Sequence, residues 1–250
     1  MNTLPRIQKP LKMPFSENGF IPTLNHYGYM LNTPDPYSSM FIEHAGKASG
    51  FVLDIGAAYG VATLPALEKG AHVIASDLDE RHLKILWERT SLSLRPRLIM
   101  KAGIFPTEVS FPPFAFEAVL ASGVLHYLSG EELEKAFKAI FASLKHKGKF
   151  FFFTSTPYIG LFKEFLPLYY EKKRQNDKWP GLITDSWMYA PHRKSDLPKR
   201  INLLDEDILE RLFLEIGFTI EKKSYVSMSD YPSDIQSDGK EYIGFIGKKP

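Results

Sequence analysis

The sequence contains no cysteine among its 250 residues. This absence excludes thiol catalysis, a disulfide framework and any cysteine-ligated metal, and it leaves the redox compartment open. An excess of one charge sign is lacking as well, since 31 Lys and Arg residues against 29 Asp and Glu residues give a formal net charge of only +2. Such a balance gives no global electrostatic case for nucleic acid, although basic clusters occur at 172–174, 192–194 and 199–200.

Long apolar runs and several familiar site patterns are missing too. No apolar stretch approaches eighteen residues, and the first ten residues lack the apolar core of a secretory signal. We therefore expect a soluble, cytoplasmic protein with no membrane partner. No His-Glu-x-x-His spacing is present, so no catalytic metal is expected, and the absence of a Gly-x-Ser-x-Gly elbow argues against a serine hydrolase.

What the sequence does contain is a regular alternation of short apolar runs with helical periods, which starts at residue 51. This alternation is typical of βαβ units and a parallel sheet. The predicted strands are 51–55, 72–76, 97–101, 117–121 and 149–154. Because 44% of the residues are hydrophobic, one sizeable core can be buried, and we expect one domain over 1–250.

Helix signals lie between and after these strands. Leu83, Leu86 and Trp87 mark one apolar helix face. Ser129 and Glu132 form a capping box before a second apolar face, which consists of Leu133, Phe137, Ile140, Phe141 and Leu144 and ends before Gly148. A third helix is predicted over 206–216, after a cap at Asp205 and before Gly217. Two strands near 218–226 and 241–248 then follow, and they are predicted to pair as an antiparallel hairpin at one edge.

The stretch Asp54 to Gly60 predicts a site for a nucleotide-type cofactor. Gly56 and Gly60 allow a tight strand-to-helix turn whose backbone approaches a ligand closely, and the following helix directs free N–H groups there. Asp77 ends the next strand, where an acidic residue binds ribose hydroxyls in doubly wound folds. Ala58 stands where a dinucleotide fingerprint requires glycine, which argues against NAD, and no Walker A sequence is present.

This motif resembles the first motif of the class I S-adenosylmethionine (SAM)-dependent methyltransferases, and the order of elements, with its closing antiparallel strand, resembles that family too. The resemblance implies a doubly wound, mostly parallel, seven-stranded sheet and SAM as cofactor, with S-adenosylhomocysteine as its product. The loop after 101 lacks the family's acidic residue, so adenine recognition is expected from backbone and apolar groups there. The resemblance implies that the cofactor is bound by Tyr37, Asp54, Gly56, Ala57, Ala58, Gly60, Asp77, Leu78, Ala102, Gly103, Ile104, Ser122 and Gly123.

Two segments flank this predicted SAM-binding core of 48–155. Residues 1–47, the arm, are rich in proline and predict extended segments with one short helix. Residues 156–202, the lid, are aromatic and follow a strand's carboxyl end, so they are predicted to cover the cofactor crevice. The alternative is that these aromatics only give the lid a small core of its own. The predicted acceptor-binding residues are Tyr29, Tyr127, Tyr158, Trp187, Tyr189 and His192, and residues 203–250 complete the domain.

His126 follows the fourth strand, at the turn that in this family faces both SAM and the methyl acceptor. It is the predicted general base, and the alternative is a structural role in the turn. The expected activity is methyl transfer to an oxygen or nitrogen of a small, aromatic or apolar acceptor. The alternatives are methylation of RNA or protein, and a SAM-binding protein without transferase activity. The sequence leaves the oligomeric state open.

Overall fold

The computed structural model describes residues 11–17, 19–227 and 231–250. Residues 1–10 of the arm lie outside the described residues. They include Pro5 and Pro10, and they are the residues that were compared with a secretory signal. In the described part, no helix combines the length and the apolar character needed to cross a membrane.

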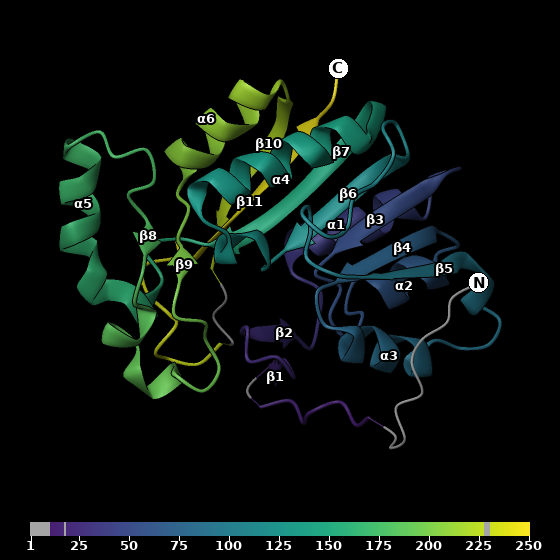
Figure 1. The fold of residues 1–250 in the computed structure, drawn as a ribbon, viewed down its shortest axis with the longest axis horizontal. Coiled ribbons are helices and arrows are strands. Elements are labelled where there is room, and N and C mark those ends of the chain that lie inside the picture. Colours follow the sequence, from purple (N-terminus) through teal and green to yellow (C-terminus); the bar gives the residue numbers. More distant parts are fainter. Residues whose placement is uncertain (1–10, 18, 228–230) are drawn as a thin grey trace.

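Within the described residues, seven strands form one central sheet (Figure 1). Their order across the sheet is β10 (Thr219–Val226), β11 (Tyr242–Lys248), β7 (Leu144–Ser155), β6 (Phe116–Ser122), β3 (Phe51–Ile55), β4 (His72–Asp77) and β5 (Leu98–Ala102). From β7 to β5 neighbouring strands are parallel, and β11 is antiparallel to both β7 and β10. The predicted doubly wound, seven-stranded sheet is confirmed, with the hairpin at its edge.

Helices cover both faces of the sheet. On one face lie α1 (Pro36–Ala45), α2 (Thr63–Glu68) and α3 (Glu80–Arg89), and on the other lie α4 (Gly130–Ser143) and α6 (Glu206–Ile216). The phenylalanine run of β7 serves both cores, because successive strand side chains point to opposite faces. Phe151 and Phe153 belong to the α1 side, whereas Phe150 and Phe152 belong to the α4 side.

The predicted helix boundaries hold with one correction. The capping box of Ser129 and Glu132 is present, and Asp205 accepts a hydrogen bond from Ile208 N at the start of α6. That helix ends at Gly217, whose φ of 105° is left-handed. Leu144, however, does not continue the face of α4. Its backbone is already extended (ψ 141°), so it caps α4 and begins β7 five residues before the predicted strand.

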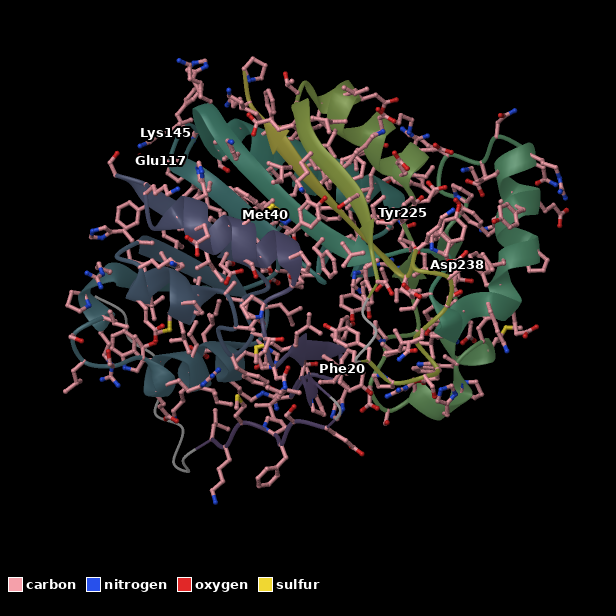
Figure 2. The ribbon with its side chains drawn as sticks, turned by 180° about the vertical axis from the view of Figure 1, so that it is seen from behind. Phe20, Met40, Glu117, Lys145, Tyr225 and Asp238 are labelled. Carbon is pink, nitrogen blue, oxygen red and sulfur yellow. The ribbon has the colours of Figure 1, made fainter. Side chains whose placement is uncertain are left out.

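The arm and the lid meet at the carboxyl ends of the parallel strands. The arm contributes the hairpin of β1 (Phe20–Pro22) and β2 (Tyr29–Leu31) and the predicted short helix, α1. The lid contains η3 (Gly160–Phe165), α5 (Leu166–Arg174), β8 (Leu182–Ile183), η4 (Ser186–Met188), η5 (Pro191–Arg193) and β9 (Ile201–Asn202), and shorter turns elsewhere are η1 (Arg95–Arg97) and η2 (Leu125–Tyr127). In Figure 2, Glu117 and Lys145 mark the amino ends of β6 and β7, and Phe20 lies toward the opposite end of the sheet.

Candidate cofactor and acceptor site

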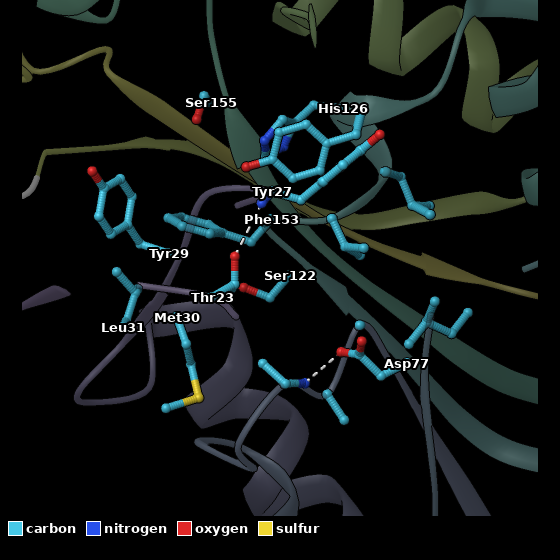
Figure 3. A pocket seen from close by; sticks show the side chains of 18 of the residues that line it. Thr23, Tyr27, Tyr29, Met30, Leu31, Asp77, Ser122, His126, Phe153 and Ser155 are labelled. Carbon is cyan, nitrogen blue, oxygen red and sulfur yellow. Dashed lines mark hydrogen bonds between the residues drawn. The ribbon is translucent and has the colours of Figure 1, made fainter. Parts of the chain in front are cut away.

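A cavity of about 450 Å³ lies at the carboxyl ends of the parallel strands, between the sheet, the arm and the lid (Figure 3). Strand ends and their turns line one part of it, called the cofactor end: Asp54, Gly56, Ala57, Ala58, Asp77, Leu78, Gly103 and Ile104. Aromatic residues line the other part, called the acceptor end: Phe20, Tyr27, Tyr29, His126, Tyr127, Phe153 and Tyr242. Open α/β sheets bind ligands at this edge.

The turn after β3 brings the backbone of Gly56 to the cavity. Gly56 has a φ of 72°, and a Cβ there would lie 2.6 Å from the Val124 side chain, so no other residue fits without displacement. Gly60, by contrast, does not line the cavity. A Cβ on Gly60 would lie 2.3 Å from Leu86 of α3, so this glycine permits close helix packing, and its predicted contact with the cofactor is corrected.

Asp77 is buried at the end of β4 and holds this turn in place. Its Oδ2 accepts a hydrogen bond from Ala58 N at 2.8 Å (Figure 3). Its Oδ1 accepts one from Asp79 N at 2.9 Å and lies 3.0 Å from His82 Nδ1. Because a carboxylate accepts about four hydrogen bonds, one acceptor position is free for a ligand. Asp77 thus faces the cavity as a hydrogen-bond acceptor whose position is fixed by the protein.

Asp54 lies beneath the same turn and is 4% exposed. Thr63 Oγ1 donates a hydrogen bond to its Oδ2 at 2.6 Å. Burial raises the pKa of Asp54 to about 6, because desolvation disfavours the charged carboxylate. The negative charges of Asp77 and Asp35 act in the same direction.

The turns after β5 and β6 complete the cofactor end. Gly103 and Ile104 line the cavity, and Gly103 N donates to Asp77 O at 3.0 Å. Ala102 does not line it, because as the last residue of β5 it lies outside the turn, and its assignment to the cofactor is corrected. Ser122 and Gly123 also line it, and their contact with the cofactor stays a prediction.

Asp35 is a lining residue that the sequence analysis missed. It is 2% exposed, and its carboxylate caps α1 by accepting hydrogen bonds from Tyr37 N and Ser38 N. Ser122 Oγ also donates to it at 2.7 Å, which joins the arm to the end of β6. The Asp35-Pro36 pair is a recognisable helix start, so the cap could have been predicted, whereas the contact with Ser122 could not.

Tyr37, which the resemblance placed over SAM, belongs to the core instead. It is 1% exposed and does not line the cavity. Its ring stacks on Phe153 and fills the space beside Gly244, and its hydroxyl lies 2.9 Å from Ser224 Oγ. The aromatic residues that the arm brings to the cavity are Phe20, Tyr27 and Tyr29, from or beside the β1–β2 hairpin. Of these, only Tyr29 was predicted.

His126 lies in the cavity wall and is 5% exposed. A hydrogen bond of 3.2 Å joins its Nδ1 to Thr154 Oγ1, and its ring lies 4.2 Å from that of Tyr127. Burial lowers the pKa of His126 to about 4, because an apolar environment disfavours the imidazolium. The ring is therefore neutral at pH 7: it can accept a hydrogen bond, but it binds a proton weakly.

Most of the predicted lid residues lie outside the cavity. Tyr158, Trp187, Tyr189 and His192 do not line it. Tyr158 packs against Tyr169 and Tyr225, Tyr189 against Phe165, Trp187 Nε1 donates to Leu197 O, and His192 pairs with Asp234. Trp187 and Tyr189 thus pack within the lid, in line with the alternative of a small lid core, whereas Tyr158 also contacts Tyr225 and His192 pairs with Asp234, both outside the lid. The lid reaches the cavity instead through Ile159, Leu161, Phe162, Arg193, Leu197, Arg200 and Ile201.

Polar contacts tie the lid, the arm and the C-terminal region together over the acceptor end. Tyr29 Oη donates to Asp196 Oδ2 at 2.6 Å, and Arg193 Nη1 donates to Tyr29 Oη at 3.2 Å. The Arg193 guanidinium also holds both carboxylate oxygens of Asp234. Burial, with a contribution from Asp196, raises the pKa of Tyr29 to about 12, so its hydroxyl keeps its proton.

Comparisons with known proteins agree with this geometry. The family model described as "Methyltransferase domain" matches residues 52–148. A relative from Staphylococcus carnosus, named an uncharacterized methyltransferase, is 26% identical over 174 residues, which are 68% of this chain and 80% of the relative.

Two solved structures share the fold. A SAM-dependent methyltransferase from Methanosarcina mazei has a TM-score of 0.65 and 16% identity, covering 87% of this chain and 98% of its own. The Burkholderia thailandensis 1,6-didemethyltoxoflavin-N1-methyltransferase has a TM-score of 0.60 and 21% identity, covering 86% of this chain and 76% of its own. The strand order, the glycine turn, the placement of Asp77 and the match to a methyltransferase domain over residues 52–148 together support a class I SAM-dependent methyltransferase.

Proposed function

We propose that the protein transfers the methyl group of SAM to an oxygen or nitrogen atom of a small, aromatic or apolar acceptor. The observation that carries this proposal is that one cavity joins two chemically different ends. The cofactor end offers backbone groups and carboxylates, and the acceptor end offers aromatic rings from the sheet, the arm and η2. An acceptor bound among those rings would lie against the cofactor end.

The residues at the cofactor end fit SAM. Gly56 lines the cavity in a left-handed turn packed against Val124, and Asp77 presents a fixed carboxylate suited to a ribose hydroxyl. We assign Gly56, Ala57 and Ala58 to the amino-acid part of SAM, and Gly103 and Ile104 to the adenine. Leu78, Ser122 and Gly123 would complete the enclosure, with Asp54 beneath the turn.

SAM, when bound, supplies a sulfonium whose methyl group is already activated for in-line displacement. The protein then needs mainly to align the acceptor and to exclude water. Tyr27, Tyr127 and Phe153 would orient a flat acceptor, and the contacts of Tyr29 and Arg193 would close the lid over it. His126, neutral at pH 7, is placed to accept a hydrogen bond from the acceptor, and its service as general base stays a prediction.

Ion pairs within the molecule support a small acceptor over a polyanion. Lys173 contacts Asp205 and Asp207 at 2.7 Å, and Lys199 lies 3.3 Å from Asp185. Arg193 and Arg200 are paired at 2.9 Å, with Asp234 and Glu132 respectively. These cations are therefore partly neutralised and do not form one free basic face. The Burkholderia structure, in which 1,6-didemethyltoxoflavin and S-adenosylhomocysteine are bound, is in line with an acceptor of that kind.

The test begins with titration calorimetry of S-adenosylhomocysteine and a screen of cell extract for acceptors of labelled methyl from SAM. Binding in the micromolar range, about −7 to −8 kcal/mol, is expected. Binding without any methyl transfer would favour a SAM-binding protein over an enzyme. Labelled RNA or protein as the product would contradict a small acceptor.

Adjacent phenylalanines provide a matched pair for the acceptor end. Phe153 lines the cavity, whereas Phe152 packs in the opposite core. We expect Phe153→Leu to raise the KM for the acceptor and to leave affinity for S-adenosylhomocysteine within about threefold of wild type. Phe152→Leu should reduce stability without changing this KM. Equal effects of the two substitutions on KM would contradict the assignment.

A further inference from the structure

We propose that His82 is a positioning residue that links the cofactor carboxylate, Asp77, to the arm, so that cofactor binding and docking of residues 22–28 strengthen each other. This inference rests on the proposed cofactor site at Asp77. No sequence pattern singled out His82, which lies on α3 and is 1% exposed. It also lines the cavity.

Both ring nitrogens of His82 are engaged. Nδ1 lies 3.0 Å from Asp77 Oδ1, and the backbone N–H of Leu24 donates to Nε2 at 3.0 Å. Because a backbone N–H can only donate, Nε2 must be the unprotonated nitrogen. The proton is then on Nδ1 and is donated to Asp77. One imidazole ring thus bridges the carboxylate of Asp77 and the arm.

The arm is held at the same point by two further side chains. Tyr59 Oη accepts a second hydrogen bond from Leu24 N at 3.0 Å and donates to Pro22 O at 2.9 Å. Arg81 Nη2 donates to Leu24 O at 2.9 Å. Both polar backbone groups of Leu24 are therefore bound by residues of the turn after β3 and of α3, so Leu24 is the docking point of the arm.

The segment beyond Leu24 leads directly to the acceptor end. Thr23 Oγ1 donates to Gly28 O and accepts from Tyr27 N, which closes a compact turn. This turn places Tyr27 in the cavity lining (Figure 3), with its ring centroid 5.9 Å from that of Tyr127. Contacts consequently run without a gap from Asp77 through His82 and Leu24 to Tyr27.

This bridge has two consequences for binding. A carboxylate fixed in advance loses less freedom when it takes up a ligand, so removing His82 should weaken cofactor binding. In addition, coupling between sites is reciprocal: if docking of the arm favours the cofactor, the cofactor must favour docking of the arm. Loosening the arm from its other side, at Tyr59, should then weaken cofactor binding to a smaller degree.

The experiment uses the full chain in four forms: wild type, His82→Phe, His82→Gln and Tyr59→Phe. Phe retains a ring without polar atoms, whereas the terminal amide of Gln retains a donor group, its NH₂, and an acceptor group, its carbonyl oxygen. Tyr59→Phe removes two arm contacts and leaves the pair of His82 and Asp77 intact. Calorimetry measures affinity for S-adenosylhomocysteine, and hydrogen exchange measures protection of residues 22–28 with and without it. Thermal unfolding checks that each form is folded.

We expect His82→Phe to weaken S-adenosylhomocysteine binding about tenfold and Tyr59→Phe about threefold, with His82→Gln close to wild type. Exchange in 22–28 should rise in both Phe variants, and ligand should protect this segment in wild type more than in His82→Phe. Unchanged affinity in a folded His82→Phe protein would overturn the proposal, as would a Gln variant as weak as the Phe variant. Should His82→Phe not fold, the contrast between His82→Gln and Tyr59→Phe decides in the same way.

The outcome for the proposed function is separate. Wild-type protein that binds no S-adenosylhomocysteine would contradict the proposed function, and the ligand-free exchange data would still judge the arm contact. In that case, unchanged hydrogen exchange of residues 22–28 in His82→Phe would overturn the proposed link between His82 and the arm, and faster exchange would support it.

Discussion

The two ends of the cavity differ in how the chain builds them. The cofactor end comes from turns that each directly follow a parallel strand, and its polar groups are mostly backbone or buried carboxylates. The acceptor end comes from β1, β2, η2, β7 and β11, together with the lid, which are far apart in the chain. The cofactor end is therefore set by the sheet and its turns, whereas the acceptor end also depends on how the arm, η2 and the lid pack against the sheet. Substitutions should separate them.

The largest effect is expected from Gly56→Ala at the cofactor end. The new Cβ would combine left-handed backbone strain with a contact of 2.6 Å to Val124, so the turn must move. Strain of about 1–2 kcal/mol and overpacking of about 1–3 kcal/mol add up to about 2–5 kcal/mol, which predicts a loss of S-adenosylhomocysteine affinity of roughly 300-fold. Calorimetry measures it.

Gly70→Ala is the matched control for that substitution. Gly70 also has positive φ, but a Cβ there meets nothing within 4 Å. It should cost about 1 kcal/mol of stability from backbone strain and leave affinity unchanged. If both variants bind equally well, the turn at Gly56 is not a ligand cradle.

Asp77→Ala should have the next largest effect. Removing a charge-assisted hydrogen-bond partner costs about 1.5–3 kcal/mol, or about 10- to 150-fold in affinity for S-adenosylhomocysteine. Glu80 lies three residues further along, at the start of α3 and outside the cavity lining, so the control Glu80→Ala should bind S-adenosylhomocysteine within about threefold of wild type. Tight NAD binding with no response to SAM would overturn the assignment of the cofactor end.

His126 tests the acceptor end through pH. Its pKa of about 4 in the folded protein lies below the usual 6.5, so between these values the unfolded chain binds the extra proton. Wild type should therefore lose about 2 kcal/mol more stability than His126→Asn when the pH falls from 7 to 4.5. Urea unfolding at both pH values measures the difference.

Asp54 has the opposite sign and does not disturb this comparison. Its pKa is raised to about 6, so below that pH the folded protein holds a proton on Asp54. The stability that this proton contributes is therefore lost as the pH rises through 6. Wild type and His126→Asn both contain Asp54, so the contribution of Asp54 to the pH dependence cancels when their stabilities are subtracted. In the acceptor assay, a rate for His126→Asn within about threefold of wild type would remove the general base, since such a base contributes at least about a hundredfold.

The smallest effect is expected from Tyr37→Phe, which marks the boundary of the site. It removes only the hydroxyl contact with Ser224, so stability should fall by about 1 kcal/mol. Because Tyr37 lies outside the cavity, affinity for S-adenosylhomocysteine should stay within about twofold of wild type. A tenfold loss in calorimetry would restore its predicted contact with SAM.

The sequence by itself determined the central fold and most of the cofactor end. Apolar runs such as 51–55 and 72–76 predict strands because they record burial, and Ser129 with Glu132 predicts a helix start because caps are local chemistry. Since the carboxyl ends of parallel strands share one edge, the residues that follow different strands, such as Gly56 and Asp77, could be brought together without coordinates.

Only the tertiary structure decided which aromatic residues and which partners complete the site. Tyr37 is fully compatible with a place over a ligand, yet it packs beside Gly244 because α1 lies against the sheet. Asp35 meets Ser122, and His82 meets Leu24, across 87 and 58 positions of the chain. No periodicity or spacing records such contacts, because they depend on how the arm packs against the sheet and α3.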